Sequence, residues 1–216
     1  SIRFAQFSEG EWSSTTVTSS HTAETGIDIK VSRGKIGVAF LDEDGYASFL
    51  ESSDNGSTWE SAAGLSTRVE KKSPASGSVA LNYTSLGQPH LAYYVPGGGV
   101  QFAKPTQTSF GISWGFAVLD GSNSFGGEYL DAVIDYASRD RISFYDAVSG
   151  DLKLVKFNQK RQSFDQAFTA DGGGKSNDRV GEYSSVGINS YGQTVICYYN
   201  ISKGRLQFYI EPYNPN

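Results

Sequence analysis

One short turn recurs along the chain, and its spacing constrains the fold more than any other feature. The clearest copy is Ser52–Trp59, with the pattern Ser-x-Asp-x-Gly-x-Thr-Trp, and weaker or shortened copies lie at 107–114, 157–164 and 8–12. Successive copies end 47, 55 and 50 residues apart, at Trp12, Trp59, Trp114 and Phe164. A repeat of that length is typical of propeller blades, in which each repeat forms one small sheet that packs against its neighbours.

The composition favours many short strands joined by tight turns. The 216 residues include 25 glycines, 13 tyrosines and 13 phenylalanines, and long apolar runs with helical spacing are absent. We therefore predict one all-β domain, a β-propeller of four sequence repeats with four-stranded antiparallel blades. The predicted units are a half-blade at 1–20 and repeats at about 26–77, 78–128, 129–182 and 183–216.

Stacking the second strand of each repeat gives columns of similar residues. A column of small residues contains Ala39, Ala92, Ser143 and Cys197, and it lies between columns of large apolar residues. A small residue beside large aromatics on a central strand suits the close face-to-face packing of twisted sheets. The pattern also predicts that Cys197, the only cysteine, is buried in the core.

The order of the predicted strands suggests how such a ring closes. The chain begins with the third and fourth strands of a blade and ends with the first three strands of another. We expect the N- and C-terminal strands to share the closing blade. This blade would then contain two copies of the third strand, so one of them is in surplus. Either segment 2–7 or segment 206–209 is then displaced, or the surplus strand pairs with a second molecule, or the chain is a piece of a longer array.

Charge and residue usage exclude several classes of function. The net charge of −5 and the lack of a Lys/Arg-rich run argue against nucleic acid or an anionic membrane surface as the main partner. No stretch approaches the roughly 20 apolar residues of a membrane span. With only His21 and His90, an all-histidine metal centre and most histidine-assisted nucleophile schemes are poorly supported.

Candidate site residues lie in loops that would form the ligand-binding face of a propeller. Asp42 and Asp44 are candidates for binding Ca²⁺ through carboxylate oxygens. In three repeats a tyrosine directly follows the large aromatic residue of the second strand, which we expect to be buried. These tyrosines are candidate stacking platforms for sugar rings, with packing between blades as the alternative. The candidate ligand-binding residues are Tyr94, Tyr145, Tyr199, Glu128, Asp146 and Arg179.

The segment 52–59 resembles the Asp-box turn of sialidase-type β-propellers, the bacterial neuraminidase repeat family. Segments 89–94, 150–154 and 181–185 are also similar to strands of secreted bacterial propeller repeats. The resemblance implies the fold and a secreted or cell-surface location. It does not imply one activity, because such propellers include glycosidases, lectins and proteins with no known ligand. The Arg-Ile-Pro strand of sialidases is missing here.

Physically, the Asp box is a hairpin device, and we expect its residues to be structural. Asp54 is placed to accept hydrogen bonds from amides of its own turn, Gly56 to supply a positive φ, and Trp59 to bury its ring between sheets. The residues assigned this structural role are Ser52, Asp54, Gly56, Thr58 and Trp59.

Three functions fit these observations. The first is a non-enzymatic extracellular recognition module, lectin-like in binding glycans, with a protein ligand as the other possible partner. The second is a polysaccharide-active enzyme of sialidase-like or lyase type that uses carboxylates and arginines of the loop face. The third is a structural subunit that self-associates by strand exchange through its surplus terminal strand.

Overall fold

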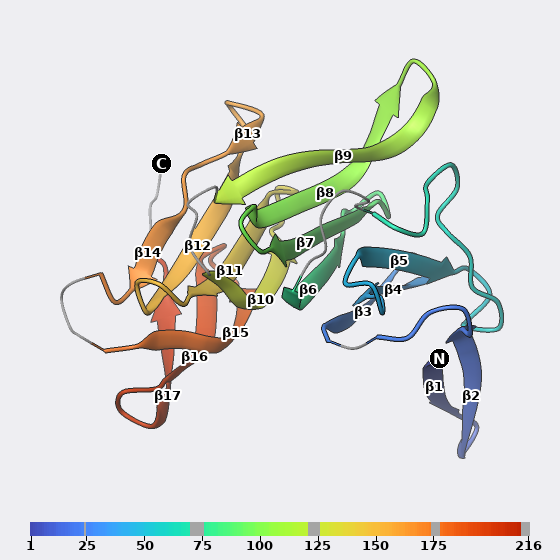
Figure 1. Cartoon of the computed structure of the whole chain (residues 1–216), viewed down its shortest axis with the longest axis horizontal. Helices are drawn as coiled ribbons and strands as arrows, with labels where there is room; N and C mark the ends of the chain where they lie inside the picture. The colour runs from blue at the N-terminus through green and yellow to red at the C-terminus, as the bar shows by residue number, and fades with distance from the viewer. Residues whose placement is uncertain (24, 70–75, 121–125, 174–177, 213–216) are drawn as a thin grey trace.

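The computed structural model describes residues 1–23, 25–69, 76–120, 126–173 and 178–212. Their regular secondary structure consists of β-strands in five antiparallel sheets, with no helix in these ranges (Figure 1). The all-β prediction is therefore confirmed. None of the described residues belongs to a helix long and apolar enough to cross a membrane.

The first two sheets come from the N-terminal third of the chain. A hairpin consists of β1 (Ile2–Ser8) and β2 (Glu11–Thr18), and the next sheet contains β3 (Ile27–Ser32), β4 (Lys35–Leu41) and β5 (Ala47–Ser52). The expected fourth strand of this sheet is reduced to two isolated bridges, Ser48 with Arg68 and Glu51 with Glu60.

The other three sheets follow in chain order. The four-stranded sheet has β6 (Ser76–Tyr83), β7 (Pro89–Val95), β8 (Gly99–Thr108) and β9 (Gly111–Asp120). The next has β10 (Gly126–Ile134), β11 (Asp140–Asp146) and β12 (Asp151–Asn158), which pairs with both β13 (Ser163–Phe164) and β14 (Phe168–Asp171). The last has β15 (Val180–Ile188), β16 (Thr194–Asn200) and β17 (Arg205–Ile210).

The prediction that the terminal strands share a closing blade is wrong. Among the described residues β1 pairs only with β2, and β17 pairs only with β16. Figure 1 shows the β1–β2 hairpin and the β15–β17 sheet on opposite sides of the molecule. The hairpin lies there because its apolar residues Ile2, Phe4 and Val17 pack on Val38 and Phe40 of the β3–β5 sheet. The described strands thus form an open array of five sheets.

Neighbouring sheets pack through the predicted columns. Ala39 and Phe49 of the β3–β5 sheet are fully buried against Leu91 and Tyr93 of the next sheet. The same arrangement recurs at the two following interfaces, where Ala92 and Phe102 meet Ile142 and Phe144, and Leu152 and Leu154 meet Ile196 and Tyr198. The repeat in the sequence is therefore a repeat of one packing interface.

In the four sheets that follow the β1–β2 hairpin, we call the first strand in chain order the innermost strand: β3, β6, β10 and β15. Two carboxylates on these strands tie consecutive sheets together. Asp28 Oδ2 accepts a hydrogen bond of 2.8 Å from the Leu81 amide, and Asp131 Oδ2 accepts one of 2.9 Å from the Val186 amide. In both residues Oδ1 accepts the amide of the next residue at 2.8 Å. Each clip holds the innermost strand of one sheet in register with that of the following sheet.

The outer face of the last sheet departs from the predicted pattern. Cys197 is exposed rather than buried, and its β17 partner Phe208 is 71% exposed. In the three preceding sheets this face is covered by the following sheet, and no described residues cover it here. The prediction for Cys197 fails because burial in this column depends on a neighbouring sheet.

We expect Gly56→Ala to destabilise the protein more than the matched variant Gly34→Ala. Both glycines have positive φ, +85° and +76°, so each variant should lose roughly 1 kcal/mol of unfolding free energy from backbone strain. A Cβ at Gly56 would also lie 2.5 Å from the Phe4 ring, whereas nothing lies within 4 Å at Gly34, so Gly56→Ala should lose at least about 1 kcal/mol more. Urea unfolding measures both, and equal losses would contradict the proposed hairpin contact.

Candidate functional site

Each sheet has two edges that matter for a site. An edge here is one of the two ends of a sheet, where its strands begin and end, and not an edge strand. The start edge is the end where the innermost strand begins and where the second strand turns into the third. The far edge is the opposite end. All six predicted ligand-binding residues lie at the start edge. Glu128 pairs with Tyr145, and Glu182 pairs with Tyr199, at the beginning of β10 and of β15.

Two of the predicted residues are in direct contact there. Arg179 donates hydrogen bonds from Nε and Nη2 to the Tyr145 hydroxyl, at 3.2 and 3.0 Å. Its guanidinium also lies 4.0 Å from the carboxylate of Glu182. The contact joins the end of β11 to the segment before β15, so it spans the boundary between two sheets.

Tyr94 and Tyr145 do not serve as exposed stacking platforms in this structure. Their residues are 5% and 1% exposed, and a Cβ on Gly127 would lie 2.6 Å from the Tyr94 ring. Burial and the nearby carboxylates of Glu128 and Asp146 raise the pKa of Tyr94. These two rings therefore take the alternative role that the sequence left open, which is packing between sheets, while Tyr199 is half-buried.

Sequence reasoning missed two other tyrosines at this edge, Tyr129 and Tyr183. Both have φ in the left-handed region, at 52° and 53°, which is uncommon for a bulky residue and recurs at functional sites. Their ring centroids are 4.4 Å apart, and Tyr183 is 66% exposed. The signal in the sequence was the repeated tripeptide Gly-Glu-Tyr at 127–129 and 181–183.

We refer to Glu128, Tyr129, Arg179, Glu182 and Tyr183 as the tyrosine cluster. Burial, a hydrogen bond with Tyr183 and the charge of Glu182 raise the pKa of Tyr129 to about 12. Its hydroxyl therefore stays protonated at neutral pH, beside carboxylate acceptors, a guanidinium donor and exposed aromatic surface. Such a set of groups suits a ligand that has both hydroxyls and an apolar face.

The carboxylates proposed to bind Ca²⁺ are paired with an arginine. Asp42 Oδ2 accepts a hydrogen bond of 2.6 Å from Arg68 Nε, and Arg68 Nη2 also donates to Asp44. Asp42 Oδ1 accepts the amides of Asp44 and Tyr46 within its own turn. Among the described residues there is no group of three or more His, Cys, Asp or Glu side chains that could hold a metal ion.

Asp146 is likewise engaged in its own turn. Its Oδ1 accepts the Val148 amide at 3.0 Å, and its Oδ2 accepts the Ser149 hydroxyl at 2.9 Å. The residue is 7% exposed, so the carboxylate has little surface to offer a ligand. Its position at the end of β11 matches that of Asp42, which directly follows β4.

The Ser52–Trp59 turn lies at the far edge and is closed by its own side chains. Asp54 accepts hydrogen bonds from the Thr58 amide at 2.9 Å and the Thr58 hydroxyl at 2.6 Å, and Ser52 Oγ accepts the Gly56 amide at 2.8 Å. The Trp59 ring is half-buried and packs edge-on against Phe4 at 5.5 Å. The turn therefore fastens the β1–β2 hairpin to the neighbouring sheet.

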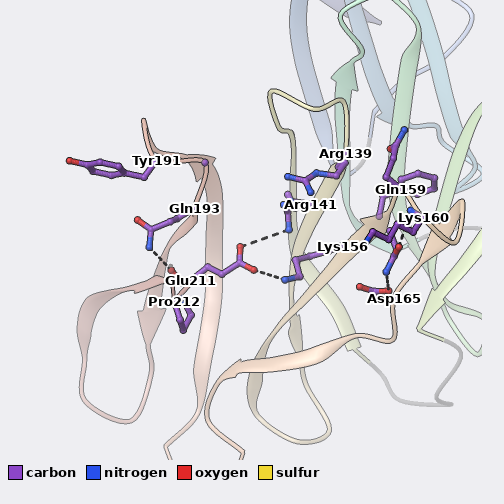
Figure 2. Close-up of a pocket in the computed structure, with 13 residues that line it drawn as sticks. Arg139, Arg141, Lys156, Gln159, Lys160, Asp165, Tyr191, Gln193, Glu211 and Pro212 are labelled. Atoms are coloured by element: carbon purple, nitrogen blue, oxygen red, sulfur yellow. Dashed lines mark hydrogen bonds and ion pairs between the residues drawn. The ribbon is translucent and has the colours of Figure 1, made fainter. Parts of the chain in front are cut away.

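The far edge also contains a pocket of about 480 Å³ between the last two sheets. Figure 2 shows Glu211, which follows β17, reaching across it to Arg141 and Lys156. None of the residues predicted to bind ligand lines this pocket. Its residues come from β11, β12 and the segments beside them, from the turn between β15 and β16, and from the segment after β17, so they meet only in the folded chain.

No protein-family model and no curated protein matches this sequence. Among solved structures, the chain is similar to a protein of unknown function from Dyadobacter fermentans DSM 18053, with TM-score 0.59 and 15% identity over 88% of this chain and 54% of that one. It is also similar to an ulvan lyase, described as a new family of polysaccharide lyase, with TM-score 0.58 and 12% identity over 83% of this chain and 48% of that one.

A third similar structure is an α-L-arabinofuranosidase from Clostridium thermocellum ATCC 27405, with TM-score 0.50 and 11% identity over 88% of this chain and 69% of that one. At these identities the likeness shows the fold alone. The chain spans about half the length of the first two structures.

We expect the stabilising effect of Asp54 to disappear in acid. Hydrogen bonds from Thr58 and Ser52 lower the pKa of Asp54 from 3.8 to about 2, so the ionised carboxylate favours the folded state above pH 3.8 and this contribution is lost as the pH falls through about 2. The wild type should unfold at higher urea than Asp54→Asn at about pH 6, and the gap should shrink at about pH 2. A gap that stays constant would contradict this role for Asp54.

Proposed function

We propose that the protein is a glycan-binding module that binds sugars at the tyrosine cluster. The observation that carries this proposal is the pair Tyr129 and Tyr183, held in strained backbone conformations with one ring largely exposed among polar side chains. Two proteins of similar fold, the ulvan lyase and the arabinofuranosidase, are glycan-active by name, which supports the ligand class.

The chemistry of the cluster favours binding over catalysis. The raised pKa of Tyr129 keeps its hydroxyl protonated, and in our proposal this hydroxyl donates a hydrogen bond to the ligand. The Arg179 guanidinium donates a hydrogen bond to the Tyr145 hydroxyl, and this contact fixes the orientation of the guanidinium. In our proposal the apolar face of a sugar stacks on Tyr183, while Glu128 and Glu182 accept hydrogen bonds from its hydroxyls.

Two interpretations of the sequence are part of this proposal. We assign the chain to the Asp-box propeller family, with support from the side-chain hydrogen bonds that close the Ser52–Trp59 turn. We also propose a secreted or cell-surface location, where a glycan-binding module meets polysaccharides and glycoconjugates. An assembly in which several such modules bind one polysaccharide molecule would gain avidity without a strong single site.

Replacement of Tyr183 should weaken glycan binding. Tyr183→Ala deletes a stacking interaction worth about 1.5 kcal/mol, so affinity for the best ligand of a glycan array should fall about tenfold or more. Tyr136→Ala is the matched control, because Tyr136 is 83% exposed and lies in the turn between β10 and β11 at the far edge. Calorimetric titration measures both variants.

Two results would contradict this proposal. One is unchanged affinity in Tyr183→Ala for every ligand of the array. The other is release of shortened or unsaturated oligosaccharides, detected by mass spectrometry, which would support the enzymatic interpretation instead.

A specific observation also favours the third function, self-association. Leu206 and Phe208 are 72% and 71% exposed on the face of the last sheet that the repeat pattern elsewhere buries. At the other end of the array, an apolar groove of about 230 Å³ lies between the β1–β2 hairpin and β3, where Ile27 and Ile29 are 56% and 47% exposed. The two surfaces differ, so contact between them would join copies head to tail.

Phe208→Asp should abolish concentration-dependent assembly in sedimentation experiments, because it places a charge in this apolar face. Phe110→Asp is the control, since Phe110 is 99% exposed in the turn between β8 and β9. A wild-type protein that stays monomeric at every concentration tested, or equal effects of the two variants, would contradict self-association through β17.

A further inference from the structure

We propose that the pocket at the far edge binds the anionic group of an acidic glycan, either a uronate carboxylate or a sulfate ester. The anion-binding character follows from the pocket itself, and the glycan nature of its ligand rests on the proposed function. The pocket lies between the β10–β14 sheet and the β15–β17 sheet (Figure 2), and no residue of the tyrosine cluster lines it. We call it the far-edge pocket.

The far-edge pocket is cationic on an acidic protein. Four cationic side chains line it and two carboxylates line it, although the whole chain has a net charge of −5. One of these carboxylates, Asp165, is paired with Arg161, a further cation beside the pocket. The lining cations are Arg139, Arg141, Lys156 and Lys160.

Arg141 is buried with part of its hydrogen-bonding capacity unused. Its side chain is 8% exposed, and its Nη2 donates to Asp135 Oδ2 at 2.9 Å. Its Nη1 lies 3.8 Å from Glu211 Oε2, beyond hydrogen-bonding distance, and its Nε has no partner among the described residues. The Nε atom itself is shielded from solvent, but a buried guanidinium that is not fully paired costs free energy, so negative charge placed beside it in the pocket would be favoured.

Glu211 offsets part of the positive charge of the pocket and is held against its wall. Burial opposes its ionisation, but hydrogen bonds from Lys156 and the Thr194 hydroxyl outweigh burial and hold the pKa of this carboxyl below its ordinary value. Because both carboxylate oxygens are occupied in this way, Glu211 is bound to the pocket wall. Arg139 Nε donates to Asp135 Oδ2 at 2.7 Å while 39% of the Arg139 side chain stays exposed, and Lys160 forms no ion pair with another described residue.

The other groups that line the pocket suit a sugar that bears the charge. The side-chain amides of Asn158 and Gln193 lie in its wall, where they donate hydrogen bonds to Asp165 and to the Glu211 carbonyl, and Tyr191 at the rim is 75% exposed. The volume lies within the roughly 300–1,000 Å³ of small-ligand sites. Guanidinium groups bind carboxylate and sulfate through paired hydrogen bonds, which explains the preference for an anionic sugar. A nucleic acid is disfavoured, because the chain has no extended basic surface.

The test compares ligands that differ only in charge. Oligogalacturonate and its methyl ester distinguish a carboxylate, and carrageenan oligosaccharides, which contain no uronate, with and without their sulfate groups distinguish a sulfate ester. The double variant Arg139→Gln/Lys160→Gln removes two exposed cations without touching the buried Arg141. Arg205→Gln, in the exposed first residue of β17 at the start edge, is the control for the loss of a cation elsewhere on the surface.

We expect the wild type to bind one charged ligand at least about tenfold more tightly than its neutral form, since charged hydrogen bonds are the strong ones. The double variant should lose that preference and the accompanying salt dependence, and Arg205→Gln should keep both. Equal binding of charged and neutral forms, or equal effects of the double variant and Arg205→Gln, would overturn the proposal. Binding of DNA by the wild type in place of either glycan would also overturn it.

Tyr183→Ala separates failure of this proposal from failure of the proposed function. If this variant loses neutral glycans and the wild type shows no charge preference, the far-edge pocket is not a ligand site while the tyrosine cluster stands. If Tyr183→Ala leaves binding unchanged and the double variant loses the charged ligand, the far-edge pocket stands and the tyrosine cluster is not the glycan site.

Discussion

The structure depends on close contact between consecutive sheets, and the column of small residues makes that contact possible. Ala39, Ala92 and Ser143 are almost fully buried, each on the second strand of its sheet. Because these residues occupy little volume, large residues of the following sheet can pack against the first sheet without a gap. A larger residue in this column would separate the sheets and expose the aromatic side chains between them. The exposed Cys197 and Phe208 show the same face without a covering sheet.

The packing also determines which tyrosines are left for a ligand. Tyr94 and Tyr145 end second strands, where the neighbouring sheet covers them, so their rings are structural. Tyr129 and Tyr183 begin innermost strands at an irregular pairing, where the register shifts and the backbone adopts positive φ. The equivalent position in the β6 strand is Gly77, which adopts φ of +75° without the strain of a side chain. Tyrosine in place of glycine at this bulge brings an aromatic ring to the start edge at a cost in backbone strain.

The positions of the strands and the shared edge of the candidate residues could be predicted from the sequence, because both depend on local alternation and on the repeat. The described strands largely lie where alternation and the columns placed them, and the six ligand-binding candidates share one edge because strand order alone assigns them to it. The ring closure could not be predicted correctly, because the chain order does not say on which sheet Ile2 and Phe4 pack. The tyrosine cluster depends on positive φ at two tyrosines, for which Gly-Glu-Tyr is a weak signal. The far-edge pocket was missed because Arg141 and Glu211 are distant in sequence and meet only through packing.

Both candidate sites span one boundary, that between the β10–β14 sheet and the β15–β17 sheet. At the start edge Tyr145 contacts Arg179 across it, and at the far edge Arg141 and Lys156 face Glu211 across it. Between the two sites, Asp131 accepts the Val186 amide and so fixes the relative position of the innermost strands. A shift of one sheet against the other would change the distances in both sites together. The carboxylate clip at Asp131 therefore holds the geometry on which both sites depend, although it contacts neither ligand in our proposals.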